Sequence, residues 1–418
     1  MISQLKNLGP GLLFAGAAIG VSHLVQSTRA GADFGLGLIW ALLLANLFKY
    51  PFFQYGPRYA AATNESLLDG YYKLGKGTII TYYLLTFLTM FVIQMAVTIV
   101  TAGIASSLFY EFSPFNIGFM TISSVQIWSI VILLICFSLL MLGKYKLLDN
   151  LIKIIIITLS ISTIVAVLMA FHKNNHELSF VQVLPKGSIE IAFLIAFMGW
   201  MPAPLDVSVW HSLWSLEKKK TQSSYVPSNA LFDFNIGYIG TIILGVCFVL
   251  LGALVMFSSG ESFSGSAGVF AGQLIDMYTS SLGNWAYIII GIAAFTTMFS
   301  TTLTTLDASP RSMDRTTELL FDKSFKSGYL FWIILLCLGT VYIFLFLGSE
   351  MGKLVKIATI LSFITAPFYA IINYILISGK HTPKAWRPSK ALHVLSWLGI
   401  AFLIGFSIWY LSILDWSF

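Results

Sequence analysis

Charged side chains are scarce in this sequence, and their scarcity excludes an ordinary soluble protein. Only 10% of the 418 residues are charged, whereas 57% are hydrophobic. Soluble proteins are about 25% charged and about 45–50% apolar. So few charges cannot cover the surface of a soluble chain of this length. The protein therefore needs lipid as its solvent, because lipid accepts apolar side chains.

Cysteine is also rare, and several catalytic motifs are missing. Cys136, Cys247 and Cys337 each lie in a long apolar run, with no metal-ligand spacing and no even count. A disulfide framework is therefore excluded, and we expect these thiols to pack in the core. The sequence has no nucleophile–base pair, no phosphate-binding loop and no metalloprotease motif. We expect no enzymatic activity and no cofactor.

Long apolar segments are abundant. A helix needs about 20 mostly apolar residues to cross the hydrocarbon core of a bilayer. Eleven segments meet this length, with the approximate limits 10–30, 35–57, 78–105, 122–143, 147–171, 188–214, 231–258, 284–307, 327–348, 354–378 and 391–414. No connection is long enough for a soluble domain. We therefore predict an all-α integral membrane protein with a single transmembrane domain over 1–418.

Lysine and arginine are distributed unevenly between the connections. With a cytoplasmic N-terminus and eleven crossings, 17 basic residues fall inside and 5 outside, while Lys49 and Lys153 lie within spans near their ends. Cytoplasmic loops of membrane proteins carry this excess. We therefore expect a multi-pass protein of the cell membrane whose C-terminus lies outside. The same distribution explains the net charge of +6 without a nucleic-acid partner.

The first span contains residues that weaken a helix. Gly16, Gly20 and Ser22 precede or adjoin His23, and Gln26 follows. Glycine costs about 1 kcal/mol against alanine inside a helix. We expect the helix to unwind locally here. The alternative is close helix packing through the small residues.

The sixth span is interrupted by two prolines. Pro202 and Pro204 each remove a backbone donor and clash with the preceding turn, so the helix cannot continue through them. Asp206 follows, and it is the only carboxylate that we place near the middle of a span. An ionised carboxylate there costs about 3 kcal/mol or more, so it needs a partner, a bound cation or a proton. The alternative is a hydrogen-bonded structural aspartate.

The positions of the two interruptions predict the architecture. Broken helices at corresponding places in two halves are typical of inverted-repeat transporters, which bind substrate at the midplane and work by alternating access. We place the repeats at approximately 9–171 and 188–378, with an extra helix at 391–414. We expect a monomer embedded in the lipid bilayer.

The eighth span is rich in hydroxyl groups. Ser300, Thr301 and Thr302 lie in it, and we consider them candidates for binding a coupling ion such as sodium through neutral oxygens. Hydroxyls at this density also form hydrogen bonds to their own helix, which is the other interpretation.

Three stretches resemble a known family. GPGLLFAGAAIGVSHLVQSTRAGADFGLGLIWALLLANL is similar to the first two helices of the Nramp (natural resistance-associated macrophage protein) divalent-metal transporters. Met201-Pro202 resembles the Met-Pro-His motif of their sixth helix, and ATILSFITAPF resembles their tenth. The resemblance implies a LeuT-type fold with 11 transmembrane helices, discontinuous first and sixth helices, and transport of a divalent cation.

The sequence departs from the family pattern at the expected ligands. Gly20-Val21-Ser22-His23 stands where Nramp proteins carry Asp-Pro-Gly-Asn, Ala203 replaces the histidine of helix six, and Thr359 replaces the glutamine of helix ten. The resemblance thus implies altered selectivity. We propose His23, Met201 and Asp206 as metal ligands, since a thioether favours softer metals. The wider set of substrate-binding candidates is Gly20, Ser22, His23, Gln26, Met201, Ala203, Asp206 and Thr359.

The missing metal ligands leave a second function open. The alternative is a LeuT-fold transporter, possibly sodium-coupled, for a small organic or other non-metal solute. In that case His23 and Gln26 bind the solute and Trp200 or Trp210 packs against it. A channel, receptor or membrane enzyme is the third class considered.

Overall fold

The chain is almost entirely helical, as predicted. The computed structural model describes residues 9–117, 120–173, 178–221, 229–257, 263–322, 327–346 and 351–413. The two strands, β1 (Phe115–Ile117) and β2 (Met120–Ile122), form a small antiparallel hairpin in which Phe115 pairs with Ile122. This hairpin lies in a connection between helices, and of its two strands only Ile122 is buried among the described residues.

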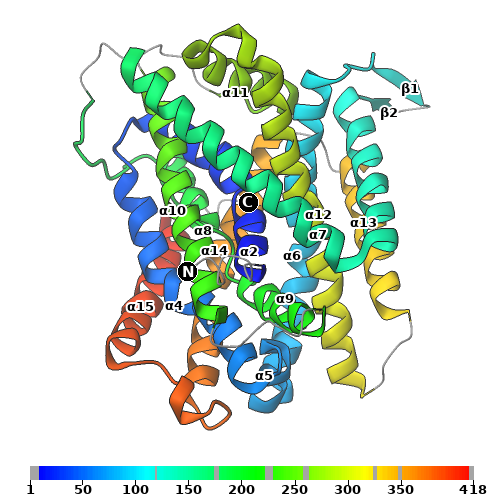
Figure 1. Cartoon of the computed structure of the whole chain (residues 1–418), viewed down its shortest axis with the longest axis vertical. Helices are drawn as coiled ribbons and strands as arrows, with labels where there is room; N and C mark the ends of the chain where they lie inside the picture. Colours follow the sequence, from blue (N-terminus) through cyan, green and yellow to red (C-terminus); the bar gives the residue numbers. More distant parts are fainter. Residues whose placement is uncertain are drawn as a thin grey trace.

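Nine helices within the described residues are long and apolar enough to cross a membrane. They are Pro10–Phe34, which comprises α2 (Pro10–Ala18), η1 (Val21–Ser27) and α3 (Thr28–Phe34); α6 (Lys76–Leu108); the two apolar halves of α7 (Ser124–Lys173); α10 (Ala230–Val255); α12 (Tyr287–Phe321); α13 (Gly328–Phe346); α14 (Met351–Ser378); and α15 (Lys390–Ile413). Figure 1 shows that α7 reverses direction near its middle, so its two halves run oppositely. The prediction of many apolar helices is confirmed.

Two further helical elements cross the protein without meeting that criterion. They are α4 (Ile39–Thr63) and the pair formed by α8 (Ser188–Trp200) and α9 (Val207–Thr221). α4 carries Lys49 and Arg58, and α8 has only 13 residues before it stops. Both elements pack against each other, and α9 also packs against α2, which lies near the middle of the molecule in Figure 1. The ring of Phe53 on α4 contacts that of Phe14 on α2.

Burial separates central from peripheral helices. The apolar window of Pro10–Phe34 is 89% buried, whereas those of α13 and α15 are only 28% buried. Large apolar side chains are correspondingly exposed on the outer helices, for example Leu338 and Ile408. Lipid accepts such side chains, so an apolar outer surface is the expected packing for a membrane protein. The N-terminal helix thus lies in the protein interior.

Several shorter elements were not predicted. They are α5 (Leu67–Leu74), α11 (Ala267–Leu282) and the 3-10 turns η3 (Asn284–Ala286) and η4 (Lys384–Trp386). α5 begins with a capping box in which Ser66 and Asp69 bond to each other's backbone. The limit of 307 expected for the eighth span was also wrong, because α12 continues to Phe321. In Figure 1, α5 lies at one end of the molecule and α11 at the other.

Candidate functional site

The first break lies between α2 and η1, where unwinding was predicted. Ile19 (φ −80°, ψ 75°) and Gly20 (φ −141°, ψ −122°) leave the helical conformation, and the chain continues as a π-helix from Val21 to Ser27. A Cβ added at Gly20 would lie 2.5 Å from Oγ1 of Thr301. Glycine is therefore favoured here, because a side chain at this position would collide with the Thr301 side chain of α12.

The second break separates α8 from α9, as the two prolines predicted. α8 ends at Trp200, Met201 is extended (φ −89°, ψ 117°), and helix resumes only at Val207. Pro202 and Pro204 cannot donate the backbone hydrogen bonds that a continuous helix needs. The segment is nevertheless buried, so the carbonyl oxygens that it frees must find other donors.

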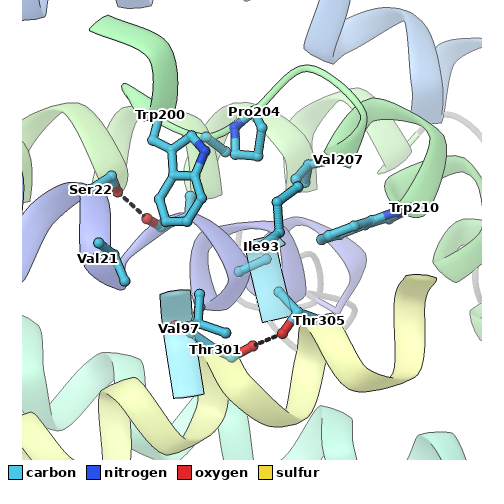
Figure 2. A pocket seen from close by; sticks show the side chains of 13 residues that line it. Val21, Ser22, Ile93, Val97, Trp200, Pro204, Val207, Trp210, Thr301 and Thr305 are labelled. Carbon is cyan, nitrogen blue, oxygen red and sulfur yellow. Dashed lines mark hydrogen bonds between the residues drawn. The ribbon is translucent and has the colours of Figure 1, made fainter. Parts of the chain in front are cut away.

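The two breaks share one small cavity of about 20 Å³. Its wall comes from α2 and η1, from α8, α9 and the segment between them, and from α6 and α12 (Figure 2). The lining residues are Ala17, Ala18, Val21, Ser22, Ile93, Val97, Trp200, Ala203, Pro204, Val207, Trp210, Thr301 and Thr305. A void of this size admits roughly one water-sized sphere. None of these lining residues is acidic.

Neutral donors take up the carbonyl oxygens at the first break. The Ser22 hydroxyl donates to the Ala18 carbonyl at 2.5 Å. Nε2 of His23 lies 2.9 Å from the carbonyl oxygen of Thr241 on α10, and because a carbonyl only accepts, Nε2 is the donor. Nδ1 of His23 lies 2.6 Å from Oγ of Ser22, so it competes with the Ala18 carbonyl for the single hydroxyl proton of Ser22. His23 therefore links the broken helix to α10, with both ring nitrogens engaged, and it does not line the cavity.

The hydroxyl-rich part of α12 reaches the same break. Oγ1 of Thr301 donates to the Gly16 carbonyl at 3.1 Å, and Thr301 lines the cavity. Thr302 instead pairs with Thr101 of α6 at 2.7 Å. The hydroxyl of Ser300 is buried and has no partner among the described residues. Of the three candidates for binding a coupling ion, only Thr301 lies at the cavity.

A lysine that we expected near the end of a span holds the second break. Lys49 lies near the middle of α4 and is 0% exposed, so the expected position was wrong. Its Nζ donates to the carbonyls of Met198 and Gly199, both at 2.7 Å, and lies 3.5 Å from that of Ala203. The one signal in the sequence is a lysine nine residues from the nearest other charge, Arg58, inside an apolar helix.

The remaining acid candidate lies apart from the cavity. Asp206 is 4% exposed and immediately precedes α9. Its Oδ1 is buried without a partner among the described residues. Its backbone carbonyl accepts from the amide of Val209 at 2.8 Å, which starts the new helix. A carboxylate at a helix N-terminus is favoured by the helix dipole.

Other predicted ligands have mainly packing contacts. Met201 is fully buried but does not line the cavity, and Oε1 of Gln26 is buried without a partner within the described chain. The Thr359 backbone lies against Gly199, where an added Cβ would come within 2.2 Å of the Thr359 carbonyl oxygen. Ser22 and Ala203 do line the cavity. The assignment of all these residues as substrate ligands stays a prediction.

The proposed metal ligands His23, Met201 and Asp206 are not brought together at the cavity, since none of them lines it. Within the described ranges, no three His, Cys, Asp or Glu side chains are grouped so that they can hold a metal ion. A metal at this site therefore needs neutral oxygens or a rearrangement of the side chains.

Comparison with known proteins places the chain in a family. The sequence matches the description "Natural resistance-associated macrophage protein-like" (Nramp) over residues 11–412. The chain belongs to the Nramp family. The resemblance seen in the first two helices is thereby confirmed over nearly the whole chain. Because the Nramp family consists of membrane transporters, the protein is a transporter and not an enzyme. This Nramp chain is also 36% identical to an uncharacterized protein of Pasteurella multocida (strain Pm70), over 98% of this chain and 93% of that protein.

Solved structures share the fold at low sequence identity. A manganese transporter mutant from Eremococcus coleocola has a TM-score of 0.70 at 14% identity and covers 97% of this chain and 85% of its own. MhsT in complex with L-phenylalanine has a TM-score of 0.67 at 16% identity, covering 97% and 98%. A nucleobase-cation-symport-1 family transporter with bromovinylhydantoin bound has a TM-score of 0.61 at 14% identity, covering 97% and 91%. The LeuT-type fold is therefore shared by proteins with chemically different ligands.

Proposed function

We propose that this Nramp-family chain is a secondary transporter that moves a divalent metal cation by alternating access, with a selectivity different from that of typical Nramp proteins. The observation that carries the proposal is the convergence of both helix breaks on one small buried cavity. A volume of about 20 Å³ suits one dehydrated ion far better than an organic molecule in this conformation.

The chemistry of the cavity supports the altered selectivity. The polar side chains in its wall are the hydroxyls of Ser22, Thr301 and Thr305 and the indoles of Trp200 and Trp210, and only the hydroxyls can supply oxygen ligands. Uncharged oxygen ligands suit hard cations such as Mg²⁺, Ca²⁺ and Mn²⁺ more than soft metals. Because the wall contains no carboxylate, we expect it to bind a cation more weakly than a site that contains an acid. The affinity for the cation then depends mainly on how many neutral oxygens coordinate it.

The topology that we propose has eleven spans. To the nine apolar helices we add α4 and the α8–α9 pair, each of which lies beside α2 (Figure 1). The repeats then run over approximately 9–171 and 188–378, followed by the extra helix at 391–414. The excess of lysine and arginine in the connections expected inside supports a cytoplasmic N-terminus and an outer C-terminus in the cell membrane. We expect the protein to work as a monomer.

A small organic solute is the second candidate, and a specific observation favours it. Most of the cavity wall is apolar, and it includes the two tryptophans Trp200 and Trp210. The indole N–H of Trp210 is buried without a partner in the described chain, so it is a donor that a solute can use. This function requires a conformation in which the cavity is larger.

Reconstituted transport separates the two candidates. Purified protein in liposomes is tested for uptake of Mg²⁺, Ca²⁺ and Mn²⁺, with and without pH or sodium gradients. We expect metal uptake that falls roughly tenfold in Ser22→Ala and Thr301→Ala, which remove about one ligand oxygen each. The matched control is Thr365→Ala on α14, since Thr365 donates only to its own helix. Absence of uptake of all three metals by the wild-type protein contradicts the metal proposal.

The acid near the second break is tested in the same assay. We expect Asp206→Asn to lose metal transport while the protein still folds, if the unpartnered Oδ1 acts on the cation during the transport cycle. Asp276→Asn on α11 is the control, because Asp276 is exposed and far from the cavity wall. Unchanged uptake by Asp206→Asn means that the aspartate is structural. For the second candidate, a thermal-shift screen with amino acids and nucleobases gives the corresponding test.

A further inference from the structure

The end of α8 has a cage of carbonyl oxygens around the amine of Lys49. The last four carbonyls of a helix have no partner within the helix. Two of them, from Met198 and Gly199, accept from Nζ at 2.7 Å, and the carbonyl of Ala203 beyond the break faces the same atom at 3.5 Å. An ammonium group has three donors and no acceptor, so the cage matches its bonding capacity.

The cage combines the negative end of a helix with a lysine that has no carboxylate partner in the described structure. The C-terminus of a helix bears a partial negative charge from the aligned peptide dipoles. Within the part of the chain that the structure describes, no carboxylate forms an ion pair with Lys49. The ring of Phe363 on α14 adds a cation–π contact at 6.0 Å. A fully buried amine without an acid partner is costly, and these groups are what offset the cost.

Transporters built on broken helices use such carbonyls for a different purpose. Unwound backbone and the C-terminal ends of half-helices coordinate Na⁺ or H⁺ there. In this protein the equivalent oxygens are taken by an amine that is part of the chain. Ala203 connects the cage with the cavity, because its carbonyl faces Lys49 and the residue also lines the cavity.

We propose that the carbonyl cage at the end of α8 is a monovalent-cation site that Lys49 occupies permanently as a tethered cation. Lys49 thus stabilises the conformation of the second break, and no dissociable ion is needed there. It also leaves the carbonyls of Met198 and Gly199 occupied, so the transported substrate relies on the first break and on α12 for its ligands. The inference rests on the proposed function only in this last point, because occupation of the cage is independent of what is transported.

Chemical rescue tests the proposal in the full-length purified protein. Lys49→Ala removes three methylenes and the amine, which together correspond to n-propylammonium. We expect its unfolding midpoint to fall by roughly 5 °C, because the cage loses its donors. Added n-propylammonium chloride, and Na⁺ to a smaller extent, restores much of the loss. Neutral n-propanol does not restore it, and the wild-type midpoint does not respond to n-propylammonium.

Two further variants keep the test decisive. Lys49→Met fills nearly the same space without charge, and we expect it to be destabilised and not rescued. Lys356→Ala on α14 is the control for loss of a lysine at an exposed site. If Lys49→Met is as stable as the wild-type protein, or if Lys49→Ala responds equally to propanol and n-propylammonium, the tethered-cation proposal is overturned. If Lys49→Ala cannot be purified, the Lys49→Met result decides alone.

The outcome is separable from that of the transport experiments. A failed rescue overturns the tethered cation but leaves metal uptake by the wild-type protein as it was measured. Conversely, a wild-type protein without any metal uptake overturns the proposed cargo but leaves the midpoint shifts of Lys49→Ala unchanged.

Discussion

The two helix breaks meet at one cavity but are held by different chemistry. At the first break, the hydroxyls of Ser22 and Thr301 donate to carbonyls of the broken helix, and the imidazole of His23 links the break to the Thr241 carbonyl of α10. At the second, the donor is the ammonium of Lys49. A neutral hydrogen bond contributes about 1 kcal/mol net, whereas one to a charged group contributes about 1.5–3 kcal/mol. The first break is therefore the more easily rearranged of the two.

This difference bears on where a cargo can bind. Hydroxyl groups can rotate and exchange a carbonyl for an incoming cation at little cost. The ammonium of Lys49 cannot leave its cage at little cost. Lys49 is fully buried on α4, so its charge would lose its hydrogen-bond acceptors while staying buried. We therefore expect cargo to contact the first break more closely than the second.

Substitution of Gly199 gives the largest expected effect. A Cβ at Gly199 would lie 2.2 Å from the backbone carbonyl oxygen of Thr359, and a backbone atom cannot rotate away. We expect Gly199→Ala to lower the free energy of unfolding by about 3 kcal/mol or more. The measurement is the thermal unfolding midpoint of the purified protein. Gly240→Ala is the control, since its added Cβ meets no atom within 4 Å. Equal midpoints for the two variants contradict the close approach of α8 and α14.

Gly20→Ala at the first break is expected to cost less. The nearest atoms to the added Cβ, 2.5–3.0 Å away, all belong to the side chain of Thr301. We expect a loss of about 1–3 kcal/mol, part of which Thr301→Ala recovers in the double variant. A double-mutant cycle of unfolding midpoints measures this coupling. Strictly additive effects would show that α12 does not pack against the break.

Removal of the imidazole should have a smaller effect than removal of the Lys49 ammonium. His23→Leu leaves the carbonyl of Thr241 without its donor, and we expect a loss of about 1–2 kcal/mol. His23→Gln keeps an N–H donor and should lose less. The comparison with Lys49→Met under identical conditions is the direct test of the contrast. A larger loss for His23→Leu than for Lys49→Met reverses our ranking of the two breaks.

The smallest effect is expected away from both breaks, at Asp69 on α5. Burial alone would raise the pKa of this carboxyl, but hydrogen bonds from Ser66 and Arg315 bring the pKa below its usual value. A lowered pKa in the folded state stabilises the protein above the pKa of the unfolded chain, and this contribution is lost as the pH falls through the folded value. Asp69→Asn should therefore cost about 1 kcal/mol or less at neutral pH and nothing in acid. Unfolding midpoints at neutral and acidic pH provide the measurement, and a loss that grows in acid contradicts the sign.

Some predictions from the sequence were confirmed because they depend on local chemistry. Pro202 and Pro204 cannot continue a helix in any surroundings, and the structure breaks there. Apolar length is equally local, so most of the long apolar helices were predictable within a few residues, whereas α12 continues beyond its apolar part to Phe321. α11 was missed because its 16 residues are too few to cross a bilayer, and the criterion of length therefore did not detect it.

By itself, the sequence determined that the protein lies in a membrane and that two of its helices are interrupted, since composition and proline act without any partner. Only the tertiary structure decided which hydrogen-bond partners the polar groups of the interrupted helices have. His23 bonds to Thr241 of α10 instead of facing the cavity, and Lys49 of α4 reaches the end of α8, some 150 residues away in the chain. Such pairings depend on how distant helices pack, and a carbonyl freed by a break accepts whichever donor the packing brings to it.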